Sequence, residues 1–149
     1  MRIRRFVESD SETVVELWRT SDLIRPGNDP NREIERKLAD SPWCFLVMVD
    51  ADEVIGSIMV GYDGHRGWVN YLACRHDHRR RGVATALMAR ADEILSARGC
   101  PKINLQVRTG NTAALGFYES LGYVEDEVSS FGRRLVIDGR TDSPSGSDR

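Results

Sequence analysis

Three apolar segments follow one another with only short polar turns between them, and this succession constrains the fold more than any other feature. The segments are "CFLVMV" (44–49), "VIGSIMVGY" (54–62) and "WVNYLAC" (68–74), joined by "DADE" and by the glycine-containing "DGHRG". Connections of this length favour hairpins between neighbouring strands. The sequence therefore predicts a run of adjacent, mostly antiparallel strands in the middle of the chain.

Helices are expected on either side of this run. Ser9 and Glu12 have the spacing of a capping box, which predicts a helix through about Asp22. Asp29 is expected to cap a second helix in which Pro30 takes the first position. A third helix is expected between the glycines at positions 82 and 99, where apolar residues recur at helical spacing, and a fourth from about 112 to 121.

Further strands are predicted at 2–7, 102–107, 123–128 ("YVEDEV") and 130–137 ("SFGRRLVI"). Strands joined by hairpins then stand beside strands joined through helices, so the sheet should be mixed. The predicted fold class is α+β, with a central, mostly antiparallel, twisted sheet of about seven strands and about four helices. One domain is expected over residues 1–138. The polar segment 139–149 is expected to be a disordered tail.

Composition narrows the class of protein. The 149 residues carry a formal net charge of −2, which argues against a general nucleic-acid binder. No apolar run reaches the length of a membrane span and the N-terminus lacks a signal-peptide pattern, so a cytoplasmic protein is expected, with no membrane partner. Cys44, Cys74 and Cys100 are odd in number and widely spaced, so we expect buried thiols rather than a disulfide framework.

The segment "HDHRRRGVATAL" (76–87) concentrates positive charge directly before a helix start. Free backbone N–H groups and the helix dipole attract anions at such a position. Gly82 allows a phosphate to approach the backbone closely, and the three arginines before it add forked donors. The pattern predicts a pyrophosphate-binding loop, with a merely solvated basic loop as the alternative. It is neither a Walker A loop nor a GxGxxG turn.

Two motifs resemble those of the GNAT family of N-acetyltransferases. Arg79-x-x-Gly82-x-Ala84, after the strand "VNYLAC", resembles the family's acyl-CoA-binding motif (Q/R)xxGx(G/A). "INLQVRTGNTAALGFYESLGY" (103–123) resembles the second signature, a strand, an Asn turn and a helix ending in an aromatic motif. The resemblance covers roughly residues 2–137. The segments "LIRPGNDP", "VGYDGHRG", "RGCPKI" and "FGRRL" further resemble the YpeA-type branch.

The resemblance implies direct transfer of an acetyl group from acetyl-CoA to a primary amine of a small molecule, protein or peptide, without a metal. It implies that the strand at 68–74 separates from the strand at 102–107, so that pantetheine can enter. Tyr118 matches the tyrosine that acts as general acid in many members. The implied acetyl-CoA-binding residues are Leu72, Ala73, Cys74, Arg79, Arg80, Arg81, Gly82, Val83, Ala84, Thr85 and Asn111.

The general base is not identified by sequence. Gln106 stands where several relatives carry glutamate, and a neutral amide does not accept the proton of the amine. Asp63, His65, Glu119 or water are the other candidates. We therefore hypothesise an acceptor of low pKa, such as an α-amine near 8. A lysine near 10.4 would cost about 3 kcal/mol more to deprotonate at neutral pH.

Several residues keep a second interpretation. Cys74 could act as a covalent nucleophile, although buried thiols are usually inert. His76 and His78 have partial metal-ligand spacing, against a solvated loop. Asn111 could cap the last helix, contact coenzyme A, or do both. Asp22 and Arg25 could select a charged acceptor or be exposed loop charges.

Two rival functions also remain open. One is a non-catalytic, regulatory acyl-CoA-binding module, and the other is an RNA-binding protein that uses the arginine cluster. The expected partners are acetyl-CoA and an amine acceptor but no nucleic acid, with the chain a monomer or a homodimer.

Overall fold

The computed structural model describes residues 1–139. The predicted tail, 139–149, lies outside the described residues apart from its first position. The chain divides into two compact units, Met1–Leu105 and Gln106–Arg149. The expectation of one domain over 1–138 stays a prediction. Among the described residues, no helix is long and apolar enough to cross a bilayer.

The first unit contains the sheet. Its strands are β1 (Arg2–Arg5), β2 (Phe45–Asp50), β3 (Glu53–Tyr62), β4 (Gly67–Cys74) and β5 (Ile103–Asn104), in the spatial order β1-β2-β3-β4-β5. The first three pairings are antiparallel and the last is parallel. This confirms the predicted run of hairpins and the mixed sheet.

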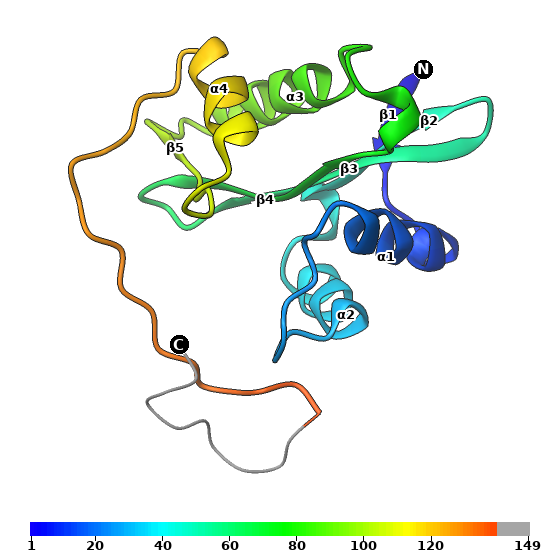
Figure 1. Cartoon of the computed structure of the whole chain (residues 1–149), viewed down its shortest axis with the longest axis horizontal. Coiled ribbons are helices and arrows are strands. Elements are labelled where there is room, and N and C mark those ends of the chain that lie inside the picture. The colour runs from blue at the N-terminus through cyan, green and yellow to red at the C-terminus, as the bar shows by residue number, and fades with distance from the viewer. Residues whose placement is uncertain (140–149) are drawn as a thin grey trace. The chain divides into compact units, whose positions relative to one another are not determined.

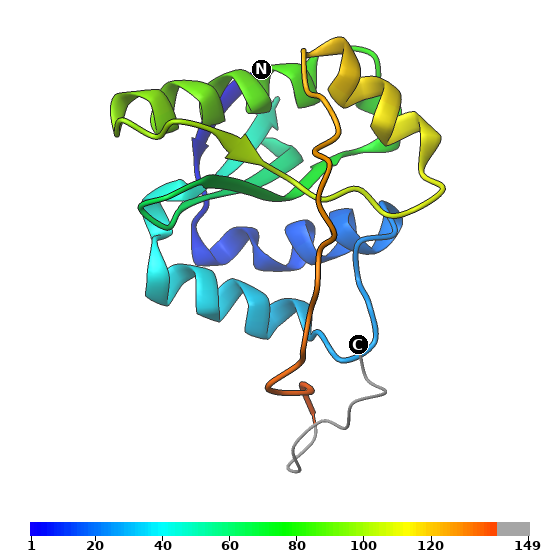
Figure 2. The ribbon, with the colours of Figure 1, turned by 90° about the vertical axis from the view of Figure 1, so that its left-hand side faces the viewer.

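Helices cover both faces of this sheet. α1 (Ser11–Thr20) and α2 (Pro30–Asp40) lie on one face and α3 (Val83–Ala97) on the other (Figures 1 and 2). The apolar side of α1 and strands β2 and β3 form the main core; its buried members include Val14, Leu17, Trp18, Ile34, Phe45, Val47, Val54 and Met59. Burial of these apolar side chains stabilises the unit and fixes the sheet between its helices.

The predicted start of α2 is confirmed, but that of α1 is wrong. The Asp29 side chain accepts hydrogen bonds from the N–H groups of Asn31 and Arg32, at 2.8 and 3.3 Å. No capping box forms at position 9, because a 3-10 turn at 8–10 precedes α1. Asp10 organises this turn: it accepts from Arg4 at 2.7 and 3.0 Å and from the Val7 N–H at 2.9 Å. Burial acts to raise the pKa of Asp10, but these donors outweigh it and the pKa is lowered.

The second unit contains α4 (Thr112–Ser120), which gives the four predicted helices. Asn111 caps it by accepting the Ala114 N–H at 3.1 Å, so the capping prediction is confirmed.

The strands predicted at 123–128 and 130–137 do not form, so the described sheet has five strands rather than about seven. Alternating apolar residues favour a strand only where one face is buried, and an isolated hairpin is marginal in water. Here that face is open: Val124, Val128, Phe131, Leu135 and Val136 are 59–94% exposed. The strand expected at 102–107 is likewise shortened to β5.

Helix α3 packs close to the sheet at two strand glycines. A Cβ at Gly56 would lie 2.8 Å from Val83 Cγ1 and 3.2 Å from Leu87 Cδ1. A Cβ at Gly67 would lie 2.6 Å from Leu95 Cδ1. Side chains of α3 fill the space that a larger strand residue would take. The two glycines therefore set how closely the whole length of α3 approaches β3 and β4.

Gly56→Ala should lower the free energy of unfolding by about 1–3 kcal/mol, because the added methyl overpacks the contact with Val83. Gly61→Ala is the matched control on the same strand, since a Cβ there meets no atom within 4 Å. The control should change stability by less than about 0.5 kcal/mol. Urea denaturation measures both, and equal stability of the two variants would contradict the close approach.

Candidate active site

A bulge interrupts the pairing of β4 with β3. Ser57 pairs with Ala73 and Met59 pairs with Asn70, so the single residue between them on β3 faces two residues on β4, Tyr71 and Leu72. Tyr71 has a φ of 53°, in the left-handed region that a non-glycine residue occupies only at a cost of about 1–2 kcal/mol. Such a bulge redirects the groups that follow it along the strand.

Within residues 1–139, the other edge of β4 belongs to a ladder only at its first two residues. The ladder with β5 contains two pairs, Gly67 with Ile103 and Trp68 with Asn104, and goes no further. Backbone groups of successive strand residues point to opposite edges. The Arg75 N–H donates to Ile55 on β3 at 2.8 Å, so the N–H of Cys74 faces the open edge. The end of β4 thus offers unpaired backbone groups, as an extended ligand requires.

The start of α3 presents free donors. Gly82 occupies the N-cap position with a φ of 80°, and no side chain caps the helix. The first bond within the helix runs from the Ala86 N–H to the Gly82 carbonyl, at 2.9 Å. The N–H groups between them, those of Val83, Ala84 and Thr85, are the donors that a helix start leaves unsatisfied. The positive φ at Gly82 explains why glycine stands here.

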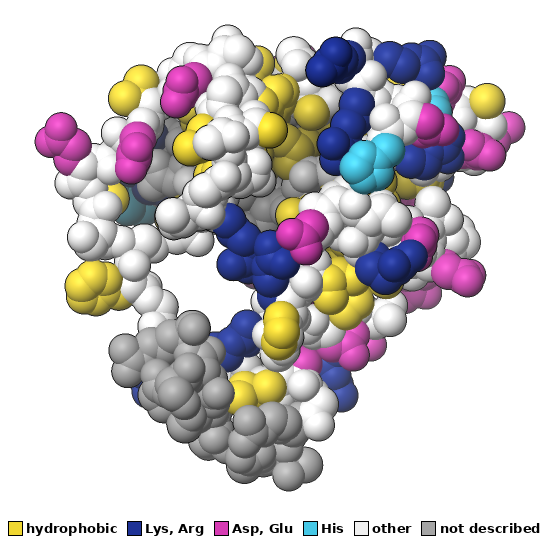
Figure 3. Space-filling view, in the orientation of Figure 1, with side chains coloured by type: hydrophobic (Ala, Val, Ile, Leu, Met, Phe, Trp, Pro, Cys, Tyr) yellow, Lys and Arg dark blue, Asp and Glu magenta, His cyan; other side chains and the backbone are white. Residues whose placement is uncertain are grey.

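Exposed arginines surround this helix start. Arg79 and Arg80 are exposed, and the Arg81 side chain is 52% exposed, with its guanidinium 4.0 Å from Asp50. Figure 3 shows Lys and Arg side chains gathered with histidines over the part of the first unit where Figure 1 places the start of α3. Positive charge and free N–H groups therefore coincide, and this part of the surface attracts anions.

Two histidines directly before the arginine loop (residues 79–82) attach this part of the chain to β2 and α1. The buried His78 ring lies between two carboxylates, with Nε2 2.9 Å from Asp50 Oδ2 and Nδ1 2.8 Å from Asp77 Oδ1. His76 Nε2 lies 3.1 Å from the Thr20 carbonyl. The two rings are thus engaged with protein oxygens, which favours neither a metal pair nor a simple solvated loop. Hydrogen bonds from Arg75, then from His78, lower the pKa of Asp77 to about 2.

Burial raises the pKa of the Cys74 thiol, and the smaller effect of neighbouring arginines does not reverse this. The side chain therefore stays a thiol at neutral pH. A thiol is a poor nucleophile compared with a thiolate, which argues against the covalent route.

Asp63 is a weak candidate for the general base. Its Oδ1 accepts the N–H groups of Arg66 and His65, at 2.7 and 2.8 Å, and its Oδ2 accepts from Trp68 Nε1 at 3.3 Å. The hydrogen bonds from Arg66 and then His65 lower the pKa of Asp63, so its carboxylate binds a proton less readily than usual. The residue forms the turn that joins β3 to β4.

The charged pair expected near the acceptor is engaged internally. Arg25 donates to Asp22 at 3.0 Å in the segment between α1 and α2. The Asp22 side chain is 87% exposed, whereas that of Arg25 is 27% exposed. The ion pair is thus at the surface, as the exposed-charge interpretation expects.

The remaining candidates belong to the second unit. Tyr118 lies on α4 and is half-buried, with its ring edge-on to Phe117 and Tyr123, at centroid distances of 5.1 and 5.8 Å. Burial raises the pKa of its phenol to about 12, with a smaller contribution from Tyr123. Gln106 donates to the Ser130 hydroxyl at 2.7 Å, and Glu119 is exposed.

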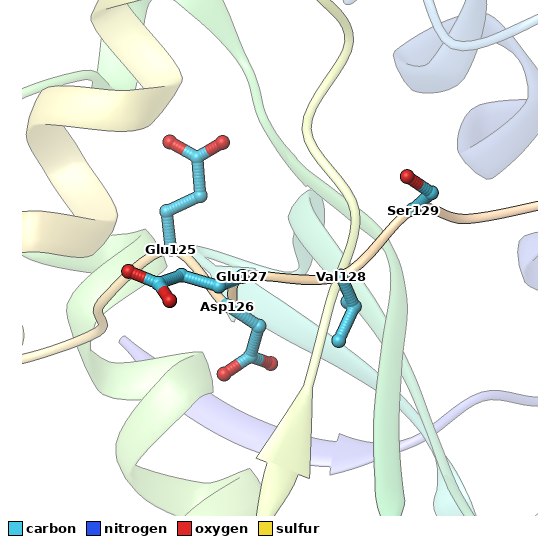
Figure 4. A pocket seen from close by; sticks show the side chains of 5 residues that line it. All are labelled: Glu125, Asp126, Glu127, Val128 and Ser129. Atoms are coloured by element: carbon cyan, nitrogen blue, oxygen red, sulfur yellow. The ribbon is translucent and has the colours of Figure 1, made fainter.

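An acidic hollow also lies in the second unit, lined by residues 125–129. Figure 4 shows that the carboxylates of Glu125, Asp126 and Glu127 point in different directions from one extended, non-helical segment of the chain. Carboxylates that diverge do not form a joint binding site. Among residues 1–139, no three or more His, Cys, Asp or Glu side chains are grouped to hold a metal ion.

Sequence reasoning placed Trp18 on the inner face of the first helix, but it missed Ser57 and the hydrogen bond between the two side chains. The Trp18 indole donates to the Ser57 hydroxyl at 3.0 Å, and that hydroxyl donates to the Tyr71 carbonyl in the bulge at 2.9 Å. The sequence feature that could have indicated this role is the lone serine inside the apolar run "VIGSIMV", because a buried hydroxyl needs hydrogen-bond partners. Its partners lie far away along the chain and gave no local pattern.

An uncapped, arginine-rich helix start beside an open strand edge is the arrangement expected of an acyl-CoA-dependent transferase. The chain matches the acetyltransferase (GNAT) family over residues 6–123. It is 52% identical over 139 residues to the acetyltransferase SG1711 of Sodalis glossinidius, across 93% of this chain and 98% of that protein.

Solved structures share the fold. Ard1 from Thermoplasma volcanium matches with a TM-score of 0.75 and 28% identity, over 83% of this chain and 82% of that chain. A chain of the NatC complex bound to a Gag peptide and CoA matches with a TM-score of 0.73 and 22% identity, over 85% and 86%.

The chain belongs to the GNAT acetyltransferase family, and the fold expected from the two motifs is confirmed. It is an N-acetyltransferase that moves an acetyl group from acetyl-CoA to an amine. Its assignment to the YpeA-type branch stays a prediction.

Proposed function

We propose that the loop before α3 and the first turn of α3 bind the pyrophosphate of acetyl-CoA, and that the open edge of β4 binds its pantetheine arm. The observation that carries the proposal is the uncapped helix start at Gly82, with three arginines directly before it. A capped start, or one followed by acidic residues, would not suit a polyanion. The acetyl group would then lie near the end of β4.

The donor set fits a diphosphate. The N–H groups of Val83, Ala84 and Thr85 supply directed donors, and the positive φ of Gly82 turns the chain into the helix without a side chain in the way. Arg79, Arg80 and Arg81 supply long, forked donors for the pyrophosphate or for the 3′-phosphate. In the second unit, Asn111 uses its carbonyl oxygen for the cap and keeps its amide N–H groups for coenzyme A.

The backbone of Leu72, Ala73 and Cys74 is proposed to pair with pantetheine. The Cys74 N–H faces the open edge, where a donor can polarise the thioester carbonyl and stabilise the negative charge that develops on its oxygen. The amine then attacks the carbonyl carbon directly, and the coenzyme leaves as a thiolate.

Tyr118 is proposed to stabilise the leaving sulfur as general acid, a role that rests on its motif and on its chemistry. With a pKa of about 12, the phenol is fully protonated at neutral pH. A thiol has a pKa of about 8.5, so complete proton transfer from Tyr118 would be uphill. We infer that Tyr118 acts mainly by donating a hydrogen bond to the developing thiolate.

The acceptor is proposed to be an amine of low pKa, such as the α-amine of a peptide. Asp63 holds its proton weakly, and Gln106 is neutral and bonded to Ser130, so neither supplies a strong base. Water then carries the proton away, which suits an amine that is already partly neutral. We further propose that the chain acts as a monomer or homodimer, without nucleic acid or membrane. A cytoplasmic location stays a prediction.

Membership of the acetyltransferase family argues against a non-catalytic, regulatory module, although the neutral Gln106 would suit one. Such a module would bind acetyl-CoA without transferring the acetyl group, so turnover with any amine decides against it.

Substituting the three arginines together, Arg79, Arg80 and Arg81→Ala, should weaken acetyl-CoA binding about tenfold or more, since charge and forked donors are lost together. Isothermal titration measures the affinity. The charge-matched control is Arg19, Arg32 and Arg36→Ala on α1 and α2, which should bind like the wild type. Unchanged affinity in the first variant contradicts the loop as the binding site. Weaker binding of dephospho-CoA by the wild type would place an arginine on the 3′-phosphate.

Tyr118→Phe should lower kcat roughly 100-fold and leave the KM for acetyl-CoA nearly unchanged, because the phenol acts only when the thiolate forms. Tyr123→Phe, the neighbouring ring, is the control and should retain most activity. Because the pKa of Tyr118 is about 12, wild-type kcat should show no decline from its ionisation between about pH 8 and about pH 10. A Tyr118→Phe variant with wild-type kcat removes the residue from the mechanism.

Two matched peptides test the acceptor class, one with a free α-amine and no lysine, the other with a blocked N-terminus and one lysine. The kcat/KM for the α-amine should be at least about tenfold higher at pH 7, because more of it is neutral. Release of coenzyme A gives the rate. A clear preference for the lysine peptide would overturn the proposal of a low-pKa acceptor.

A further inference from the structure

We propose that Ser57 and Trp18 are positioning residues for acetyl transfer: they hold the bulge of β4 in the one conformation that directs the Cys74 N–H group beyond it at the thioester. The inference rests on the proposed function of the β4 edge. It assigns a role to two side chains that lie outside the acetyl-CoA-binding motif and outside the phosphate-binding loop.

The Ser57 hydroxyl bridges α1 and the bulge. It is fully buried, accepts the Trp18 indole N–H at 3.0 Å and donates to the Tyr71 carbonyl at 2.9 Å. Tyr71 is one of the two residues that face a single β3 residue in the bulge, where the regular ladder is interrupted. A hydroxyl both accepts and donates, so one side chain satisfies two buried groups.

Ring stacking supports the same bulge from a second direction. The rings of Trp18 and Tyr71 stack at a centroid distance of 4.0 Å and an interplanar angle of 22°. Trp18 also stacks at 6.2 Å on Phe45, which belongs to β2. The side chain and the carbonyl of Tyr71 are therefore both held by Trp18, one directly and the other through Ser57.

These contacts stabilise a strained backbone. Tyr71 has a φ of 53°, which a tyrosine adopts only when its surroundings impose it. Loss of the bridge leaves the Tyr71 carbonyl without its buried donor and allows the bulge to relax. Because backbone groups alternate along a strand, a local change of conformation at the bulge reorients the N–H groups two and three residues further on. Of these two, the Cys74 N–H faces the open edge, whereas Ala73 is paired with Ser57 of β3.

Phosphate binding does not depend on this bridge. The donors proposed for the pyrophosphate lie on the arginine loop and α3, which His78 attaches to Asp50 at the end of β2. A positioning role therefore predicts a separation of effects: the orientation of the thioester changes while the affinity for the coenzyme is retained.

Three variants test the inference. Ser57→Ala removes the bridge, Trp18→Phe keeps an aromatic ring but removes the indole N–H, and Ser96→Ala, an exposed serine on α3, is the matched control. Infrared difference spectra of acetyl-CoA labelled with 13C at the thioester carbonyl report its polarisation in each complex, without any acceptor. Affinity, thermal stability, kcat and KM are measured in parallel. Trp18→Phe keeps the test available if Ser57→Ala does not fold.

In the wild type the bound carbonyl stretch should shift to lower frequency than in free acetyl-CoA. Ser57→Ala should lose most of this shift and roughly tenfold to hundredfold of kcat, with KM for acetyl-CoA within about twofold. Trp18→Phe should lose less, and Ser96→Ala nothing. Wild-type kcat and carbonyl frequency in Ser57→Ala, with only a lower melting temperature, would show a purely structural role and overturn the inference. Failure of the wild type to bind acetyl-CoA would instead overturn the proposed function, and this inference with it.

Discussion

The hydrogen bond from Ser57 to the Tyr71 carbonyl is the interaction on which the arrangement of the site depends. It supplies a donor to the Tyr71 carbonyl, which the bulge removes from the ladder between β3 and β4. It also helps to hold Tyr71 in its left-handed backbone conformation. Within the described residues, the ladder between β4 and β5 ends at Trp68, before the bulge. Without the bulge, each N–H group of β4 beyond it would point to the opposite edge of the strand, because a shift of one residue exchanges the two edges.

Charge is distributed so that the arginine loop stays available to an anion. Arg75, directly after β4, forms ion pairs with Glu53 at 3.0 Å and with Asp77 at 2.7 Å. His78 links Asp77 to Asp50 and so attaches the loop to the hairpin of β2 and β3. The nearby carboxylates of Asp50, Glu53 and Asp77 are thereby paired with Arg75 and His78, which precede the arginine loop. The arginines at 79 and 80 are left at the surface beside the free N–H groups of α3, which explains a strongly local positive charge in a chain of net charge −2.

Features encoded by neighbouring residues could be predicted from the sequence, and features that depend on distant partners could not. Short turns predicted the hairpins, Asp29 and Asn111 predicted helix starts, and the segment around Gly82 predicted the start of α3 with its free N–H groups. Anion binding at that helix start stays a prediction. The bulge could not be predicted, because Ser57 and Trp18 are 39 residues apart. The last two strands were predicted from alternation alone, but their apolar side chains find no covering surface. The capping box at Ser9 failed because Arg4 engages Asp10 and sets a different turn.

Coenzyme A is proposed to lie along the end of β4 and across the start of α3. Backbone amide NMR of the 15N-labelled protein, titrated with acetyl-CoA, tests this most directly. Large shifts are expected at Leu72 to Cys74 and at Arg80 to Thr85, because donors in these segments gain a carbonyl or phosphate oxygen. Amides of α2, on the opposite face of the sheet, should stay unchanged. Shifts confined to α2, or absent from the start of α3, would show that coenzyme A binds elsewhere.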